Sequence, residues 1–114
     1  MDLNAVNAEY IDVNDALKRI GGNVELYKKL LKRFVEGNQF SELETVLQEG
    51  KTEEAARLTH TIKGVSANLS LAKIRTLAVE LEQILIGGLD YSAKLAEFKQ
   101  ANDETLEMIA GILG

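Results

Sequence analysis

Apolar residues recur at three- and four-residue spacing in six successive segments of the chain. This spacing places them on one face of an α-helix, so the pattern predicts six helices. The first follows Asp12 and ends at Gly21 and Gly22, and the second covers about residues 24–36 after Asn23. Asp and Asn are good N-caps, and glycine commonly ends a helix. We interpret the basic stripe on the second helix as a solvated surface rather than a partner-binding patch: Lys28, Lys29, Lys32 and Arg33.

A break in the helical pattern follows at Gly37. If one straight helix continued past it, the next apolar residues would lie roughly opposite the apolar stripe of residues 27–34, and one helix could not bury both. The sequence therefore predicts a separate third helix. We expect it to open with a capping box of Ser41 and Glu44 and to end at Gly50.

The last three predicted helices are longer. They cover about residues 53–69 after Thr52, about residues 71–86, and about residues 91–113 after Asp90, with Gly87 and Gly88 between the last two. Asn102 falls on the apolar face of the last helix, where it can fix the register. The apolar residues expected to face the core are, in chain order, Ala55, Leu58, Ile62, Val65 and Leu69; Ile74, Leu77, Ala78, Leu81 and Leu85; and Tyr91, Leu95, Phe98, Leu106, Ile109 and Leu113.

These segments together predict the fold class. Nothing in the chain has the alternating polarity of a strand, and there is no proline. Short connections favour antiparallel neighbours. We therefore expect an all-α fold, an antiparallel up-and-down four-helix bundle with additional short N-terminal helices. The 114 residues suffice for one hydrophobic core, so we expect a single domain over residues 1–114.

The composition excludes several classes of function. Without cysteine there is no disulfide, thiolate metal site or cysteine nucleophile. The formal net charge is −5, and residues 76–114 carry all of it, so we expect no nucleic-acid partner. No apolar run approaches the ~20 residues that cross a bilayer, and residues 1–10 show no secretory signal. We expect a cytoplasmic monomer that does not bind membranes.

The single histidine, His60, lies opposite the predicted buried stripe of the fourth helix. At about 100° per residue it projects into solvent, together with Ala56 and Ala67, and Gly64 lies one turn on. An exposed helix face normally carries long charged side chains. A glycine inside a helix costs roughly 1 kcal/mol relative to alanine, and close approach of another molecule is one reason to keep it. We therefore interpret this strip as a landing surface for a partner, although a lone exposed histidine is more often only a surface residue.

Histidine at such a position is suited to phosphoryl transfer. Near pH 7 a neutral imidazole has one ring nitrogen with a free lone pair, which can take a phosphoryl group. Lys63, three residues on, offers positive charge to the phosphoryl oxygens. The other ring nitrogen needs an acceptor that orients the ring. If the chain reverses near Ser70, residues 80–83 lie level with His60, and Glu82 is the best candidate, with Gln83 second.

The segment His60-Thr61-Ile62-Lys63-Gly64 resembles the His-x-x-Lys-Gly motif of histidine phosphotransfer (HPt) domains. The small residues that follow, the segment 77–82, the earlier Gly-Gly-Asn-x-Glu-Leu-Tyr segment and the overall length are also similar, so the resemblance covers nearly the whole chain. One position departs from the family. Where HPt domains usually have a glycine six residues after Lys-Gly, this chain has Ser70, and we expect a slightly different turn there.

The resemblance implies a multistep phosphorelay. His60 would accept a phosphoryl group from the aspartate of a receiver domain and pass it to another receiver, in a response regulator or a hybrid histidine kinase. Mg²⁺ would be held by the receiver, so this chain would need no cofactor or metal and, as a phosphoryl carrier, would not be an enzyme. Ala56, Arg57 and Ala67 would contact the partner, with Lys63 complementing the receiver's acidic site.

The sequence leaves two alternatives open. One is the phosphorylation domain of a larger histidine kinase, of chemotaxis or hybrid type, excised from its parent. Such a domain would be phosphorylated by a kinase domain bound to ATP, for which this chain has no glycine-rich loop. The other alternative is a helical adaptor without phosphoryl chemistry. With one histidine, no cysteine and no carboxylate cluster at ligand spacing, an independent hydrolase or metalloenzyme is disfavoured.

Overall fold

The computed structural model describes Leu3 and residues 6–114, and these residues form six α-helices and no strand. The helices are α1 (Val13–Arg19), α2 (Val24–Glu36), α3 (Phe40–Gln48), α4 (Thr52–Asn68), α5 (Ala72–Ile86) and α6 (Ser92–Leu113). Residues 1–2 and 4–5, part of the stretch in which we expected no secretory signal, lie outside the described residues. The predicted all-α class and the separation of α2 from α3 are confirmed.

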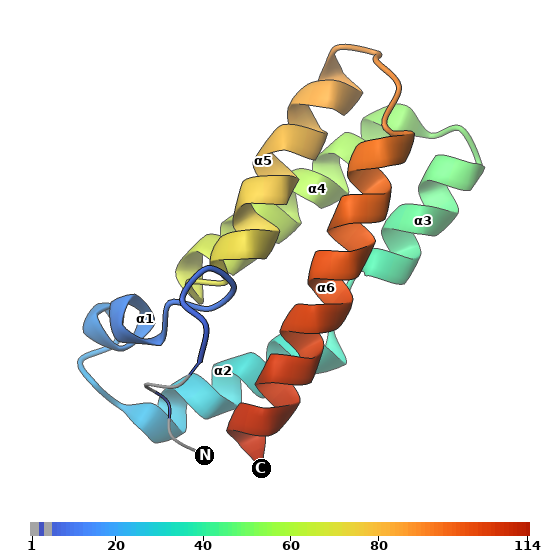
Figure 1. Ribbon diagram of the computed structural model, residues 1–114. Coiled ribbons are helices and arrows are strands. Elements are labelled where there is room, and N and C mark those ends of the chain that lie inside the picture. The colour runs from blue at the N-terminus through green and yellow to red at the C-terminus, as the bar shows by residue number, and fades with distance from the viewer. Residues whose placement is uncertain (1–2, 4–5) are drawn as a thin grey trace.

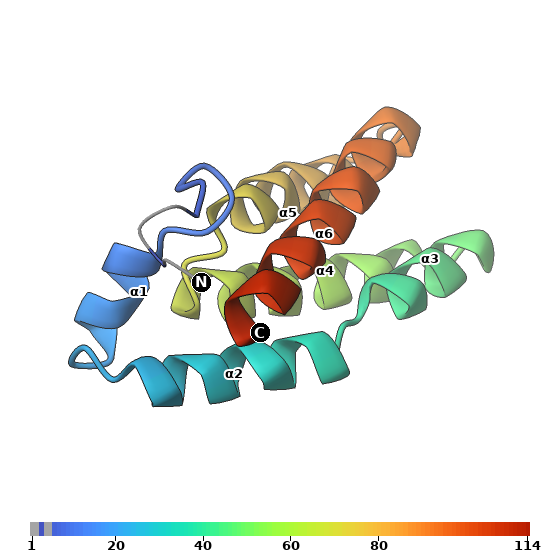
Figure 2. The same ribbon diagram turned by 60° about the horizontal axis from the view of Figure 1, so that its bottom comes forward.

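The four helices α3, α4, α5 and α6 run in alternating directions, as Figure 1 shows. Of the helix pairs, α4 and α5 have the most extensive contact, followed by α5 with α6. The second helix, α2, packs against α6, and α1 closes the end of the bundle near the α4–α5 turn (Figure 2). The body is therefore an up-and-down bundle, with the two N-terminal helices at one end and side.

The hydrophobic core draws buried residues from every helix. Tyr27 and Leu31 of α2 and Phe98 of α6 are among the largest fully buried side chains. Phe40 of α3 stacks on Phe98, with the ring centroids 5.7 Å apart. Aromatic pairs of this kind contribute about 0.5–1.5 kcal/mol of stability beyond that from the apolar area they bury. This pair therefore joins the start of α3 to the middle of α6.

Two of the predicted N-caps are confirmed. The Asp12 carboxylate accepts a hydrogen bond from the Asp15 amide at 3.1 Å, and the Asn23 side chain accepts one from the Leu26 amide at 3.0 Å. At the start of α6, Asp90 accepts a hydrogen bond from the Ser92 amide at 2.9 Å, although the N-cap position itself is Tyr91. Each contact satisfies a backbone donor that the first turn of a helix leaves unpaired.

The predicted caps of α3 and α4 are wrong. The third helix begins at Phe40, whose amide donates to the Asn38 side chain at 3.2 Å, so Ser41 and Glu44 already lie inside the helix and form no capping box. Thr52 is the first residue of α4 rather than its cap. Both helices start before the best-capping side chain indicates, α3 by two residues and α4 by one.

The buried stripe of α4 differs from the predicted one. It contains Ala55, Thr59, Ile62, Ser66 and Leu69, whereas Leu58 is half-buried and Val65 is 39% exposed. At about 100° per residue, the stripe is rotated by about 40° from the predicted one. Thr59 and Ser66 are tolerated inside because their hydroxyls donate to carbonyls of their own helix, those of Ala55 at 2.8 Å and Lys63 at 3.0 Å.

The last helix shows the same kind of difference. Phe98 and Ile109 are buried as predicted, but the other predicted inward residues of α6 are only half-buried: Tyr91, Leu95, Leu106 and Leu113. Ala101, Thr105 and Ile112 take their place in the buried face, which also contains Asn102 as predicted. The Asn102 side chain accepts a hydrogen bond from the Asn38 side chain at 2.9 Å. The pair fixes α6 against the α2–α3 break, as a buried polar residue at this position can do.

The turn between α4 and α5 is tied to the N-terminal part of the chain. Ser70 adopts a left-handed conformation with φ +55°. Its carbonyl accepts from the Asp12 amide at 2.9 Å, and its hydroxyl donates to the Asp15 carboxylate at 2.6 Å. The Tyr27 hydroxyl donates to the neighbouring Leu69 carbonyl at 2.9 Å. These contacts hold the reversal that sets the register of α5 against α4, and with it the surroundings of His60.

Candidate functional site

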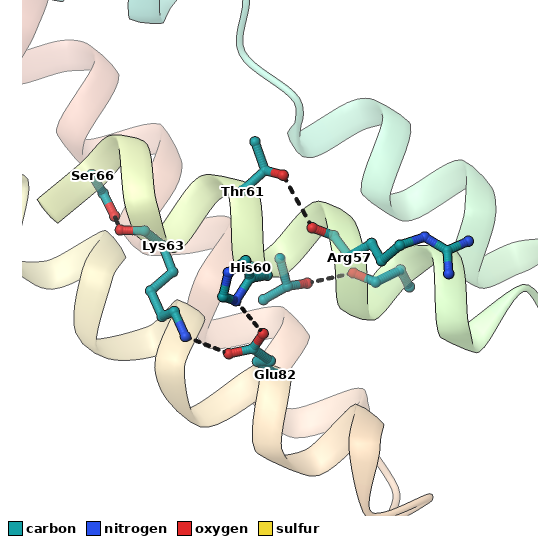
Figure 3. Close-up of polar contacts among 8 residues, drawn as sticks. Arg57, His60, Thr61, Lys63, Ser66 and Glu82 are labelled. Atoms are coloured by element: carbon teal, nitrogen blue, oxygen red, sulfur yellow. Dashed lines mark hydrogen bonds and ion pairs between the residues drawn. The ribbon is translucent and has the colours of Figure 1, made fainter. Parts of the chain in front are cut away.

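His60 lies in the middle of α4 on the solvent-facing side of the bundle, and 67% of its side chain is exposed. The ring leans toward α5 rather than straight out, as Figure 3 shows. The rotation of the α4 stripe explains this lean. With the buried face centred closer to Thr59 than the apolar residues alone indicate, His60 sits near the edge where α4 meets α5.

Glu82 of α5 reaches across to this edge. Its Oε2 lies 2.8 Å from Nδ1 of His60, and its Oε1 accepts a hydrogen bond from Nζ of Lys63 at 2.7 Å. The carboxylate side chain is 10% exposed, so both contacts form at the boundary between core and solvent. Gln83, the second candidate acceptor in the sequence, is exposed, and no hydrogen bond joins its side chain to His60 among the described residues.

The charge on Glu82 determines which ring nitrogen of His60 carries the proton. The Lys63 ammonium lowers the pKa of the Glu82 carboxyl, and the hydrogen bond from His60 lowers it further, while burial acts in the opposite direction. An ionised carboxylate can only accept hydrogen bonds. Nδ1 of His60 must therefore carry a proton and donate it to Glu82. In the neutral ring, Nε2 then has the free lone pair, and this is the nitrogen available to an incoming electrophile.

Lys63 is engaged rather than free. Its side chain is 29% exposed, and its ammonium is paired with Glu82 within the same cluster as His60. The sequence alone suggested a cation free to meet phosphoryl oxygens. Instead, the ammonium stands beside the histidine while it neutralises the carboxylate that holds the ring. Of the cations near His60, Arg57 has an exposed side chain with no ion pair among the residues that the structure describes.

Several residues around His60 on the surface of α4 have small side chains or none. Gly64 is exposed, and a Cβ at this position would meet no atom within 4 Å, so nothing inside the domain requires a glycine there. Ala56 and Ala67 are half-buried rather than fully exposed as predicted, because the rotation of the stripe turns them toward α5. Arg57 lies at the side of the strip (Figure 3). Another molecule can therefore approach the α4 backbone closely beside the histidine.

Sequence reasoning missed two residues that shape the site. Thr59 and Ser66 are fully buried on the face of α4 that packs inside the bundle. Small buried side chains permit close packing of helices, and α4 and α5 have the most extensive contact of the helix pairs, with Glu82 of α5 within reach of His60. The spacing of the two missed residues with Ala55 and Ile62 follows a helical period, and this was the available signal. Because both residues are polar, a search for apolar residues at helical spacing does not include them.

Among the described residues, no group of three or more His, Asp and Glu side chains is placed to hold a metal ion. Nor is any helix in that part of the chain long and apolar enough to cross a membrane. What the site offers is one accessible nitrogen nucleophile, an anion that fixes its ring, and two cations within a turn. Such an arrangement allows the histidine nitrogen to accept a transferred group.

An all-helical domain with a solvent-facing histidine held by a carboxylate from the adjacent helix is the arrangement of a phosphoryl carrier. A family model for the Hpt domain matches residues 30–113. The chain therefore belongs to the Hpt domain family, whose members act in histidine phosphotransfer in two-component signalling and interact with receiver domains or histidine kinases. Searches of the curated proteins and of the solved structures returned no significant match.

Proposed function

We propose that this chain is a phosphorelay intermediate: His60 accepts a phosphoryl group from the aspartyl phosphate of one receiver domain and passes it to the aspartate of another. The observation that carries the proposal is the contact between Nδ1 of His60 and Glu82 at 2.8 Å, on a histidine whose side chain is 67% exposed. It leaves Nε2 as the nucleophile and directs it away from the bundle.

In the proposed step the Nε2 lone pair attacks the phosphorus atom of the aspartyl phosphate. The P–O bond to the aspartate breaks, and that carboxylate leaves with the electron pair. Positive charge develops on the imidazole as the N–P bond forms, and the Glu82 carboxylate stabilises it through the Nδ1 proton. This is the role that a buried carboxylate plays for the histidine of a Ser-His-Asp triad. Transfer to the second receiver is the same step in reverse.

The surrounding residues have distinct proposed roles. Gly64, Ala56 and Ala67 keep the strip low enough for the receiver to bring its phosphorus atom within reach of Nε2. Lys63 keeps Glu82 ionised and places positive charge next to the transferred group. Arg57, exposed beside the histidine, complements the acidic pocket of the receiver. In this proposal the Mg²⁺ that assists the chemistry is held by the receiver, and the chain acts as a phosphoryl carrier without turnover of its own.

The test is transfer from a receiver domain phosphorylated with labelled phosphate. We expect label on the chain that is acid-labile and base-stable, as a phosphoramidate is, and that moves on to a second, unlabelled receiver. His60→Gln should accept none. Nitrogen-15 spectra of the phosphorylated protein should place the phosphoryl group on Nε2.

A parallel reaction with a histidine kinase catalytic domain and ATP separates the relay from the kinase-fragment alternative. Labelling by ATP and kinase, with none from any receiver, would overturn the receiver-to-receiver proposal. Asn68→Gln is the matched control for His60→Gln, because Asn68 is an exposed residue of the same helix two turns on. Equal loss of label in both variants would show that the substitution damages the helix rather than the nucleophile.

A further inference from the structure

A second candidate site lies on a different part of the molecule. A cavity of about 590 Å³ opens between α2 and α4, near the end of the bundle that α1 closes. Figure 2 shows α2 running beneath α4 in this region. The cavity reaches the core residues Phe40, Ile62 and Leu69. Its volume falls within the range of about 300–1,000 Å³ that is typical of small-molecule sites.

The walls of this cavity are apolar but incompletely covered. Leu30 and Phe34 of α2 are half-buried, and Val65 of α4 is 39% exposed. All three line the cavity, so their apolar surface faces a hollow instead of a neighbouring helix. Apolar surface that remains in contact with water gains free energy when an apolar group covers it. The walls therefore favour an occupant with an apolar body.

The polar part of the lining is positive. Arg19 and Arg33 line the cavity, whereas no Asp or Glu does, in a chain that has 18 acidic residues and a formal net charge of −5. Arg33 makes no ion pair within the described part of the chain. Arg19 uses Nε to contact Asp15 at 3.0 Å, which leaves its other N–H groups available. Because Arg33 has no carboxylate partner among the described residues, its guanidinium favours an anion in the cavity, and Arg19 adds the N–H groups that Asp15 does not occupy.

The cavity also reaches a buried amide. Asn102 is 5% exposed and lines the cavity. Its oxygen accepts from Asn38 at 2.9 Å, but its amide nitrogen has only a 3.4 Å contact with the Asn38 oxygen. An amide nitrogen has two protons to donate. The Asn102 amide can therefore donate to a polar atom in the cavity without losing the bond that it accepts.

We propose that this cavity binds a small organic anion with a compact apolar body and one carboxylate. The body would lie against Leu30, Phe34 and Val65, and the carboxylate would meet Arg33, with Arg19 beside it. The site is separate from the phosphotransfer chemistry at His60, and the proposal does not depend on it. A small molecule fits better than a protein segment, because the lining reaches inward to the buried residues Phe40, Ile62 and Asn102 and the volume of about 590 Å³ is that of a small-molecule site.

The experiment is a titration of the full chain followed by ¹⁵N and methyl NMR. The probes are 3-phenylpropanoate, its uncharged amide and inorganic phosphate. We expect phenylpropanoate to shift the Val65 methyls and the side-chain amide signals of Asn102 and of Asn68, which also lines the cavity. The dissociation constant should be about a millimolar for a molecule of this size. The amide and phosphate, each lacking one half of the proposed chemistry, should bind several-fold more weakly.

Two matched variants test the charge. Arg33→Gln should weaken phenylpropanoate binding by about fivefold or more, whereas Lys32→Gln, the same charge change on the adjacent residue outside the cavity, should leave it unchanged. Equal weakening in both variants would assign the effect to general electrostatics and overturn the proposal. Absence of shifts at the cavity residues would also overturn it. Concentration-dependent shifts there without any probe would mark the occupant as a second copy of the chain and overturn it as well.

Discussion

Replacing Glu82 by glutamine tests the central contact of the site with almost no change in shape. The carboxylate now serves two donors, His60 Nδ1 at 2.8 Å and Lys63 Nζ at 2.7 Å. A glutamine amide has one acceptor oxygen. If it accepts from Lys63, its NH₂ group faces Nδ1 and favours the tautomer with the proton on Nε2, which blocks the nucleophile. If it accepts from His60, the Lys63 ammonium loses its counterion.

The size of the effect follows from the geometry. A hydrogen bond to a charged group contributes about 1.5–3 kcal/mol, and we take the lower end because the His60 side chain is 67% exposed. Since about 1.4 kcal/mol corresponds to a factor of ten in rate, we expect Glu82→Gln to slow phosphoryl transfer about tenfold. The fold should be retained, since one hydrogen bond of the pair remains and the shape of the side chain does not change.

The assay is single-turnover transfer from a phosphorylated receiver, with the imidazole ¹⁵N shifts recorded on the same samples. The shifts should report the Nδ1–H tautomer in the wild type and a larger share of the Nε2–H tautomer in Glu82→Gln. Glu80→Gln is the control, because Glu80 is an exposed residue of the same helix that pairs with Lys94 instead. A Glu82→Gln variant that transfers within about twofold of the wild-type rate, with unchanged ring shifts, would refute the reasoning.

Three further predictions concern neighbouring features. Gly64→Ala should stabilise the domain by about 0.5–1 kcal/mol in chemical denaturation, because its Cβ would meet no atom within 4 Å. Gly64→Arg should keep the fold but abolish transfer. Transfer by Gly64→Arg at the wild-type rate would show that the strip of small residues is not needed. At the α4–α5 turn, Ser70→Ala keeps the strained φ of +55° and loses the bond to Asp15, so it should destabilise by about 1–2 kcal/mol, whereas Ser70→Gly relieves the strain and should stay close to wild type. The reverse order of the two melting temperatures would contradict this account. Finally, Lys63 holds the pKa of Glu82 below its usual range, and Ser70 and then Arg19 do the same for Asp15. Groups with depressed folded-state pKa values stabilise the fold above their unfolded-state pKa near 4, and this contribution is lost as the pH falls through the folded-state pKa. The gap in melting temperature between wild type and Glu82→Gln should therefore shrink below about pH 4, and a gap that stays constant down to pH 2 would count against the Lys63–Glu82 pair.

Local pattern was sufficient for the helices and for the exposure of the histidine. Asp12 and Asn23 cap helices where their side chains predict, and the inward residues of α5 are those of its apolar period. These features depend on residues within one or two turns of each other, so the physics that determines them is contained in short stretches of sequence. The motif from His60 to Gly64 is equally local, and the family match over residues 30–113 agrees with it.

The exact face that α4 buries was not predictable in this way. The apolar pattern assigns Val65 to the core and does not include Thr59 and Ser66, yet in the structure Thr59 and Ser66 are fully buried and Val65 is 39% exposed. A threonine or serine hydroxyl that bonds to its own helix loses little on burial, and its small size permits close helix packing. Only the packing of α4 against α5 determines whether close contact between the helices stabilises the fold more than burial of Val65 would.

The sequence by itself determined six helices and an exposed nucleophile in a strip of small residues. The sequence made Glu82 the best candidate partner of His60 only on the condition that the chain reverses near Ser70. The tertiary structure decided that reversal, which brings Glu82, 22 positions away along the chain, to Nδ1 of His60, and it paired Lys63 with Glu82 instead of leaving it free. The cavity beside α2 likewise exists only because two helices fail to close on each other. Contacts between distant residues depend on how α4 and α5 are rotated about their axes and on the turn at Ser70, and those are set by the packing of the whole core.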